Sequence, residues 1–402
     1  MARVQGVLQA LAPSNLATCW AALRRDLDLY SGAGRKPKLQ QLREIVSLSL
    51  RGDFYPEEYF RYRFYEQGKD YPYMLQFLPE RQFKGKIWGV WNDSRWKSLL
   101  DNKWMFHLYY KSLGLQVTDV LGYYNPDDGC AITGQPLRSK EDVERLLWEH
   151  RPRSLVIKPV GGIQGNGILI VKSLHYENDL VGTRIDGKPV LFSDVIEHLE
   201  GSVNGQLRFD GYLLEERVDD HPFFAEINPY TASTIRVVTY ANARGEIEID
   251  FTTVRLGRMD RQVENYSQGG ISVGIDRDTG ELGLGQTKAR FGAVQQCSVH
   301  PDSNVRFTGR AVPMWRQVTD LCKRAAMVTP GLRSIGWDVI LTPAGPRLIE
   351  GNWDWALAVQ MHTTGYLTPQ VRARLAEHGL TFPTERLPGL QFGGFGALLR
   401  YR

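Results

Sequence analysis

The chain has 402 residues, of which 42% are hydrophobic and 23% are charged. This composition is typical of a globular protein with two or three packed lobes, and it excludes a disordered or fibrous chain. The 49 basic and 45 acidic residues give a net charge of +4, which is too small and too dispersed to indicate a nucleic-acid surface.

Cysteine spacing and hydropathy exclude further classes. The four cysteines, at positions 19, 130, 297 and 322, lie far apart and form no C-x-x-C pair, so neither a zinc site nor a disulfide framework is expected. No apolar run approaches the roughly 18 residues that span a bilayer. The first twelve residues suit a helix better than a signal peptide. The sequence therefore predicts a cytoplasmic protein with no membrane partner.

The first part of the chain, up to about residue 121, has a helical pattern. Apolar residues repeat near a period of 3.6 between residues 39 and 50, which indicates an amphipathic helix. A second helix is predicted over residues 101–112. The segment 54–63 is rich in aromatic and arginine residues, and packing of a helix explains it better than a nucleic-acid stacking surface. Residues 1–90 are thus a helical region, with acceptor choice and homodimer formation as its two candidate roles.

Beyond residue 120 the pattern changes to short β-rich segments separated by glycine, with helices between them. This alternation indicates an α+β fold. The predicted strands cover residues 154–159, 167–172, 212–216, 234–241, 246–253, 334–341 and 347–351, and the intervening helices cover residues 193–200 and 315–328.

Two of these strands place a pair of carboxylates opposite each other. If residues 335–341 and 347–352 form a hairpin centred on Ala344, then Asp338 lies directly across from Glu350. The side chain of Asn352 emerges on the same face, because side chains alternate along a strand. The same register places Ile340 and Leu348 on that face, and Trp337, Val339 and Ile349 on the other.

Two facing carboxylates repel each other, so removal of one is predicted to leave stability unchanged or higher. A divalent cation would convert that repulsion into coordination. The oxygen donors of Asp338, Glu350 and Asn352 suit Mg²⁺ or Mn²⁺ and suit zinc poorly. The alternative is a solvated hairpin face without a ligand.

A lysine and a glycine-rich loop form a second candidate site. Lys158 ends an apolar strand, and glycines follow at positions 161, 162, 165 and 167. Glycines allow left-handed conformations that turn successive N–H groups toward an anion, and the lysine adds a point charge. The loop joins two strands, so it is not a dinucleotide-binding fingerprint. The alternative interpretation is a simple turn.

These motifs, in this order, resemble the ATP-grasp superfamily, and most closely its sugar-transfer associated branch. The resemblance covers roughly residues 90–365. An Asp, a Glu twelve residues later and an Asn two residues beyond make the ordered set specific. The stretches that carry it are Asp101-Asn-Lys-Trp, Val156-Ile-Lys-Pro, Glu215-Glu, Thr234-Ile-Arg-Val, Gln268-Gly-Gly, His300-Pro, Ala311-Val-Pro-Met-Trp, Gly336-Trp-Asp-Val and Ile349-Glu-Gly-Asn.

The resemblance implies a division of the chain. ATP would lie between two α+β lobes, an N-terminal lobe at residues 91–150 and a C-terminal lobe at residues 216–370. A lid subdomain at residues 151–215 would close its glycine loop over the phosphates. Residues 371–402 would form a tail.

The resemblance also implies roles for individual residues around the nucleotide. Lys103 and Lys158 would bind the α- and β-phosphates, under the lid glycines Gly161, Gly162, Gly165 and Gly167. Asp338, Glu350 and Asn352 would hold Mg²⁺. The acids Glu215 and Glu216 would stand at the adenine hinge, where the backbone of Arg217 and Val218 reads the base edge. Asp219 is the ribose candidate, with Asp220 and His221 as alternatives, because a Gln-His pair common in this branch is missing here.

For the reacting groups, the resemblance implies that Arg236 neutralises the transferred phosphoryl group. Arg255 is a second candidate, for a substrate carboxylate, and Gln268, Gly269 and Gly270 are assigned to the substrate site. The implied reaction is ATP-dependent ligation of a carboxylate to an amine through an acyl phosphate. The substrates would be small molecules such as an amino acid, a sugar acid or a small peptide.

Two other functions stay open at this stage. One is phosphotransfer by a small-molecule kinase or through a phosphohistidine, for which His107, His175, His198 and His300 are available. The other is nucleotide binding without catalysis. The presence of both lysines and all three metal-ligand candidates argues against a degenerate site.

Overall fold

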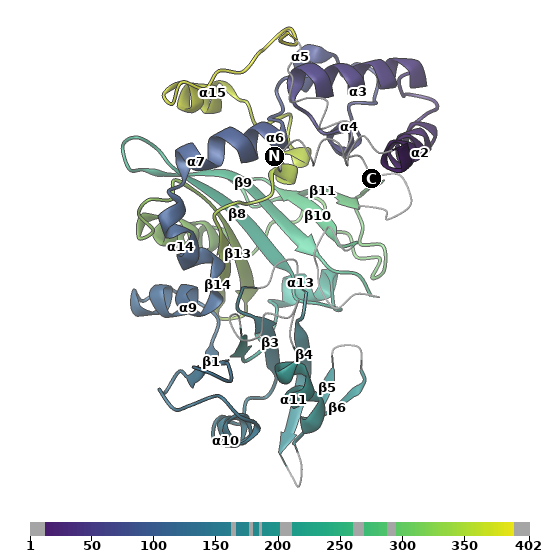
Figure 1. Cartoon of the computed structure of the whole chain (residues 1–402). Helices are drawn as coiled ribbons and strands as arrows, with labels where there is room; N and C mark the ends of the chain where they lie inside the picture. The colour runs from purple at the N-terminus through teal and green to yellow at the C-terminus, as the bar shows by residue number, and fades with distance from the viewer. Residues whose placement is uncertain are drawn as a thin grey trace. The chain divides into compact units, whose positions relative to one another are not determined.

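A computed structural model describes residues 13–161, 166–176, 180–184, 187–201, 211–259, 269–287 and 295–389 (Figure 1). The chain divides into two compact units, each of which is described by itself. The first unit comprises residues 1–91, 288–295 and 356–402, and the second comprises residues 92–287 and 296–355. No helix within the described ranges is long and apolar enough to cross a membrane.

The described part of the first unit is helical, as the sequence predicts for residues 1–90. The amphipathic helix expected at residues 39–50 is α3, whose Ile45 and Leu48 are buried. The aromatic segment that follows is core and not a surface, since the Phe64 and Phe77 rings meet edge to face with centroids 5.0 Å apart. The helices are α2 (Pro13–Leu29), α3 (Lys38–Gly52), α4 (Pro56–Arg61), α5 (Tyr71–Met74), α6 (Glu80–Gln82), η1 (Phe83–Ile87), α7 (Trp88–Trp91), η4 (Leu357–His362) and α15 (Pro369–Ala376).

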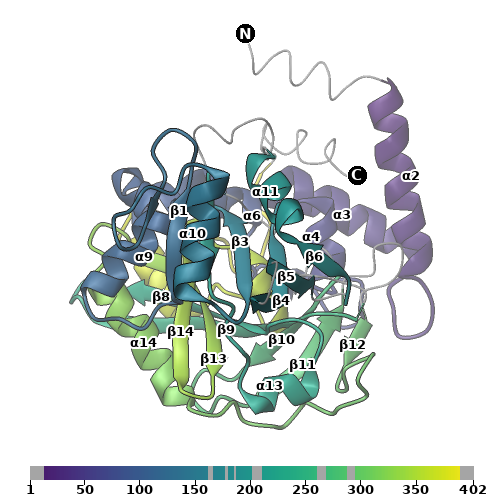
Figure 2. The ribbon, with the colours of Figure 1, turned by 90° about the horizontal axis from the view of Figure 1, so that it is seen from below.

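The second unit contains two seven-stranded sheets. In the first sheet the order is β2-β1-β7-β3-β4-β5-β6 and neighbouring strands are antiparallel. Helices α10 (Lys140–His150) and α11 (Phe192–Glu200) lie on one face, where Leu147 and Leu199 join Ile157 in a buried cluster (Figure 2). The strands are β1 (Val120–Tyr124), β2 (Cys130–Ala131), β3 (Leu155–Pro159), β4 (Leu169–Tyr176), β5 (Leu180–Arg184), β6 (Pro189–Leu191) and β7 (Tyr212–Glu215).

The second sheet has the order β12-β11-β10-β9-β8-β13-β14. One of its faces is apolar: Val237 and Trp337 pack there with Leu321 of α14 (Trp315–Met327). The other face is polar and carries the candidate site. The strands are β8 (Thr234–Ala241), β9 (Ile247–Leu256), β10 (Ile271–Ile275), β11 (Leu282–Thr287), β12 (Gln295–Cys297), β13 (Ser334–Thr342) and β14 (Gly345–Asn352); the remaining short helices are η2 (Ser94–Trp96), α8 (Lys97–Asp101), α9 (Lys103–Ser112) and α13 (Pro222–Ile227).

The single helix predicted over residues 101–112 is wrong in one respect. The chain breaks at Asn102, which has extended backbone angles, so α8 ends at Asp101 and a new helix, α9, begins at Lys103. The Asn102 side chain accepts a hydrogen bond from the Met105 N–H at 2.9 Å, which satisfies one of the unpaired donors at the helix start. Lys103 is therefore the first residue of a helix.

The β13–β14 hairpin has the predicted pairing of Asp338 with Glu350, but for a different reason. Its loop consists of two residues, since Thr342 pairs with Gly345, and that turn alone would place Asp338 opposite Ile349. A β-bulge at Ile349 shifts the register by one residue and restores the pairing. The predicted position of Leu348 is wrong, because the bulge pairs it with Val339 and so places it in the apolar core.

Two connections between the sheets lie beside the candidate site. Residues 116–118 run along β14, where the Leu348 N–H donates to the Gln116 carbonyl at 2.9 Å, and the chain then enters β1. After β7 the chain returns to the second sheet, and the His221 N–H donates to the Leu341 carbonyl at 2.7 Å. Backbone hydrogen bonds thus hold one end of the first sheet against the edge strands of the second.

Candidate active site

Strand register gathers polar side chains into two rows on one face of the second sheet. In the first row Glu350 lies opposite Asp338, Asp338 opposite Arg236, and Arg236 opposite Thr253. The second row runs parallel to it and contains Thr234, Arg255, Ser272 and Gln286. Side chains of directly paired residues point to the same face, so both rows face away from the apolar core.

Arg236 and Asp338 form a buried ion pair at the centre of this face. Both side chains are almost fully buried, and the Arg236 Nη2 donates to Asp338 Oδ2 at 2.9 Å while its Nε donates to Oδ1. Burial opposes ionisation of the carboxyl, but the charge of Arg236, aided by Arg255, outweighs it and lowers the pKa of Asp338 to about 2. Asp338 is therefore a carboxylate at any physiological pH.

Arg255 approaches the same carboxylate from the second row. Its Nη1 lies 3.5 Å from Asp338 Oδ2, and its side chain keeps about 20% of its surface exposed. Its neighbours in the row, Ser272 and Gln286, are buried although they are polar. Sequence analysis missed both neighbours; the alternation along β10 and β11 would have placed them on the face of Arg255 once that register was known.

Glu350 and Asn352 extend the site along β14. The Asn352 Nδ2 donates to the Gly336 carbonyl at 3.3 Å and to Glu350 Oε1 at 3.4 Å, which leaves the amide oxygen as the atom available to a ligand. Two carboxylates and an amide oxygen are a donor set suited to Mg²⁺. Within the described ranges no cluster of three His, Cys, Asp or Glu side chains is arranged for a metal, so an amide ligand is essential to this assignment.

The first sheet contributes a second buried ion pair, between Lys158 on β3 and Glu215 on β7. Val156 pairs with Glu215, so Lys158, two residues further along, projects from the same face as a diagonal neighbour. Its Nζ lies 2.7 Å from Glu215 Oε1, and both side chains are about 7% exposed. The structure thus brings together two residues that sequence analysis assigned separately to phosphate and to the adenine hinge.

Lys103 connects the two groups of charges. It is buried, its N–H donates to the Val160 carbonyl at 3.3 Å, and its Nζ lies 3.8 Å from Glu350 Oε2. Burial lowers the pKa of Lys103, and the nearby charge of Lys158 lowers it further while Glu350 opposes the shift. One ammonium group therefore stands between the carboxylates of the second sheet and the lysine of the first.

The segment after β7 makes backbone contacts to both sheets. The Glu216 N–H donates to the Asp119 carbonyl at 3.1 Å, and its carboxylate accepts from the Arg153 N–H at 3.1 Å. Arg217 pairs with the exposed Asp219 and is, like Val218, half-buried.

The other two ribose candidates have structural contacts. Asp220 Oδ2 accepts from the Ser233 N–H at 2.7 Å, and His221 caps α13 by accepting from the Phe223 N–H at 3.1 Å. Asp219 is thus the most exposed of the three candidates, which matches its assignment from sequence.

The predicted glycine loop and substrate loop are only partly described. Gly161 follows β3, and Gly167 has a φ of +73°, a left-handed conformation that suits glycine. Gly269 has a φ of +103° and Gly270, just before β10, is buried. Gly162, Gly165 and Gln268 lie outside the described residues.

The histidines differ in what their surroundings permit. His300 is fully buried, with Nε2 2.9 Å from the Gly257 carbonyl and Nδ1 accepting from the Asp302 and Ser303 N–H groups at 3.3 Å. Because both ring nitrogens are used, His300 has no nitrogen available for phosphorylation.

The other three histidines lie elsewhere in the second unit. His198 Nε2 lies 3.0 Å from the Gly167 carbonyl, and His175 is exposed on β4. His107 lies one turn after Lys103 on α9; it is buried, and its Nδ1 has no hydrogen-bond partner among the described residues.

The environment of His300 predicts a pH-dependent effect on stability. Burial lowers the pKa of His300 below its ordinary value of 6.5, so below that pH the unfolded chain binds a proton that the folded chain does not. The contribution of His300 to the free energy of unfolding is therefore complete above pH 6.5 and is lost as the pH falls. In His300→Asn the amide oxygen still accepts from the backbone N–H groups, but the contact to Gly257 and the titration disappear.

We expect His300→Asn to be less stable than the natural chain at pH 7.5, by roughly 1–3 kcal/mol. The difference should narrow at pH 5.5, because only the natural chain loses stability through this group. Urea unfolding at the two pH values measures both quantities. A difference that stays constant would contradict the proposed burial of a neutral imidazole.

Comparison with known proteins agrees with this architecture, in which two sheets place lysines and a carboxylate pair around one site, the arrangement of an ATP-grasp protein. The family model described as sugar-transfer associated ATP-grasp matches residues 82–374, which is more than half of the chain. The chain belongs to this family. No curated protein sequence matches it.

Several solved structures show a distant likeness. They include phosphoribosylamine–glycine ligase from Thermotoga maritima, with 13% identity over 77% of this chain and 62% of that chain and a TM-score of 0.41. The D-alanine–D-alanine ligase from Coxiella burnetii has 12% identity over 80% of this chain and 65% of that chain, with a TM-score of 0.35.

The match also spans only part of these structures, from 45% to 66% of the length of the solved chains. At such TM-scores these likenesses carry no argument about activity.

Proposed function

We propose that this chain is an ATP-dependent ligase that joins a carboxylate to an amine through an acyl phosphate. The observation that carries the proposal is the meeting of charges at Lys103, whose ammonium lies 3.8 Å from Glu350 and is affected electrostatically by Lys158. A polyphosphate needs cations on one side and a metal-binding carboxylate pair on the other. Family membership supports the same nucleotide.

Each charged residue has a role in this proposal. Lys103 and Lys158 bind the phosphates of ATP, and Glu215 fixes the Lys158 ammonium from the opposite side. Asp338, Glu350 and Asn352 hold Mg²⁺, which when bound supplies positive charge to the β- and γ-phosphates. Asp338 presents both oxygens to Arg236, yet a carboxylate has about four lone-pair positions, so acceptor capacity remains for a cation.

The arginines are suited to the reacting centre. A carboxylate becomes a good acyl donor only after it attacks the γ-phosphate, because phosphate then becomes the leaving group. Arg236 is held rigidly by Asp338 and offers a fixed positive charge where the transferred phosphoryl group carries its negative charge. Arg255 is partly exposed and stands beside it, a position suited to the carboxylate of the substrate. The amine then attacks the acyl carbon and releases phosphate.

A kinase or a phosphohistidine carrier receives less support. His300 lies in a motif of the family, but both its nitrogens are engaged in structural hydrogen bonds. The pair of arginines next to the carboxylates suits an anionic acceptor better than a neutral hydroxyl. A carboxylate from an amino acid, a sugar acid or a small peptide is therefore the proposed acceptor of the phosphoryl group.

Isotope transfer tests this mechanism. A panel that crosses carboxylates with amines, read out by ADP release, first identifies a working pair. With that carboxylate labelled by ¹⁸O, we expect one label in the released phosphate and one in the amide product, because the oxygen that attacks phosphorus leaves with it. Label in AMP would show adenylation instead, and label retained wholly in the carboxylate would show phosphorylation of another group; either result would refute the acyl phosphate.

A further inference from the structure

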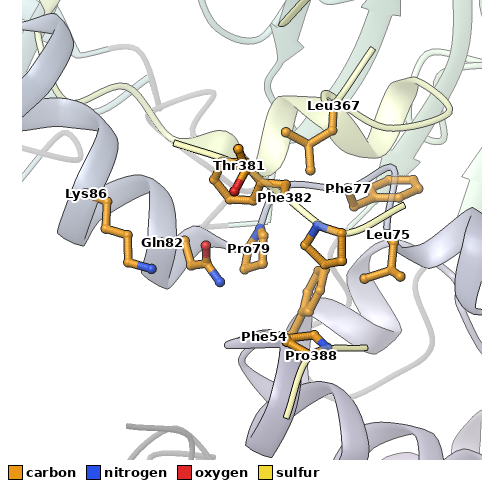
Figure 3. Close-up of a pocket in the computed structure, with 12 residues that line it drawn as sticks. Phe54, Leu75, Phe77, Pro79, Gln82, Lys86, Leu367, Thr381, Phe382 and Pro388 are labelled. Carbon is orange, nitrogen blue, oxygen red and sulfur yellow. The ribbon is translucent and has the colours of Figure 1, made fainter. Parts of the chain in front are cut away.

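The first unit contains a pocket that has no part in the proposed ligase site. Its volume is about 140 Å³, and it lies among the end of α3, the segment from α5 to η1, and the chain around α15 (Figure 3). Most of its wall is apolar. The lining residues used below are Leu75, Phe77, Leu367, Phe382, Gln82 and Lys86.

Two arginines fix the wall of this pocket. Arg372 donates hydrogen bonds to three backbone carbonyls on three separate lining segments, those of Leu75, Leu367 and Phe382, at 2.8–2.9 Å. Arg51 donates to the Pro388 carbonyl at 2.7 Å and so holds another lining segment. Segments that are distant in sequence are thereby tied together, so the pocket is preformed and its ordering is independent of a ligand.

The pocket has one polar end and one apolar end. Figure 3 shows Lys86 and Gln82 on one side, and Leu75 and Phe77 on the opposite side. Gln82 is about nine-tenths buried, and its Nε2 donates to Asp53 Oδ2 at 3.1 Å. Lys86 is exposed and has no ion pair within the part of the chain that the structure describes, in contrast to Lys84 nearby, which pairs with Glu80.

We propose that this pocket binds a small aromatic carboxylic acid, with the ring among the apolar side chains and the carboxylate at Lys86. A dry cavity of about 150 Å³ lined by Leu, Ile and Phe accommodates a benzene ring, and this pocket is of similar size. Phe77 and Phe382 provide aromatic contacts for the ring. The unpaired ammonium of Lys86, with the Gln82 amide beside it, supplies the complementary charge.

Binding is tested on the full chain without ATP, so that the result does not depend on the proposed ligase function. The probe is 4-fluorobenzoate, followed by ¹⁹F NMR titration, and 4-fluorobenzyl alcohol serves as the neutral analogue. We expect saturable binding of the acid and binding of the alcohol that is about tenfold weaker, since the alcohol lacks the charge-assisted contact.

Matched variants locate the site. Lys86→Met should weaken 4-fluorobenzoate binding about tenfold, whereas Lys84→Met, which removes a lysine of the same helical turn that does not line the pocket, should leave it unchanged. Thr381→Trp, at an exposed lining position, should obstruct the pocket with little effect on folding.

Equal binding of acid and alcohol would identify a purely apolar site and overturn the proposed ligand class. No saturable binding, or binding unaffected by both Lys86→Met and Thr381→Trp, would overturn the site itself. Loss of ligase activity in unrelated assays would bear on neither result.

Discussion

Asp338→Asn should abolish turnover and also lower the free energy of unfolding by roughly 3–5 kcal/mol, the usual effect of removing one partner of a buried ion pair. The loss of stability follows from Arg236, which would be left buried with its main counter-charge removed. The loss of turnover follows from the proposed metal site. Urea unfolding of the full chain and ADP release as a function of Mg²⁺ concentration measure the two effects.

Glu350→Gln is the matched control. Glu350 keeps about 28% of its side chain exposed and lies 3.8 Å from Lys103, so its removal leaves no tightly held buried partner. We expect Glu350→Gln to lose turnover while its stability stays within about 1 kcal/mol of the natural chain. A further variant that combines Asp338→Asn with Arg236→Gln should recover much of the stability and none of the activity. Mg²⁺-dependent turnover by either single variant would refute the metal assignment, and an undiminished stability of Asp338→Asn would refute the ion pair.

The effect of Asp338 on stability is where sequence reasoning was wrong. From the hairpin alone, removal of one acid relieves repulsion and should be harmless. The structure reverses this expectation because β13 also pairs with β8, which places Arg236 directly opposite Asp338. That pairing joins residues about one hundred positions apart, and no local pattern in either strand indicates it.

Local patterns predicted the elements well. The strand from Thr234 to Ala241 has the bounds expected from its composition, and the facing of Asp338 and Glu350 was predicted from hairpin symmetry. The symmetry argument reached the right pair through the wrong turn, since the two-residue loop and the bulge at Ile349 offset each other. A bulge leaves no clear signal in composition, so the misplaced Leu348 was unavoidable at that stage.

Long-range contacts account for what the sequence could not reveal about the site. Lys158 and Glu215 were both candidates, yet their contact depends on the pairing of β3 with β7. Ser272 and Gln286 were missed because small polar residues on strands are common, and only the register beside Arg255 marks them. The individual charges were therefore predictable, and their partners were not.

The contact between Lys158 and Glu215 also changes what a lysine substitution can show. Lys158→Met should raise the ATP concentration needed for half-maximal turnover by about tenfold or more, because the phosphates lose a charge-assisted contact. The same change leaves Glu215 buried without its ammonium partner, and we expect roughly 3–5 kcal/mol of lost stability. A weak ATP response in this variant alone could therefore come from a damaged fold.

A double variant separates the two causes. In Lys158→Met combined with Glu215→Gln the buried charge is absent from both positions, so the free energy of unfolding should return most of the way to that of the natural chain. The requirement for ATP should remain high in this variant, because the ammonium that faces the phosphates is still missing. Urea unfolding and ATP titrations on the natural chain, both single variants and the double variant form a complete cycle. If ATP affinity recovered together with stability, Lys158 would act only as the structural partner of Glu215, and the phosphate contact would have to be assigned to Lys103 alone.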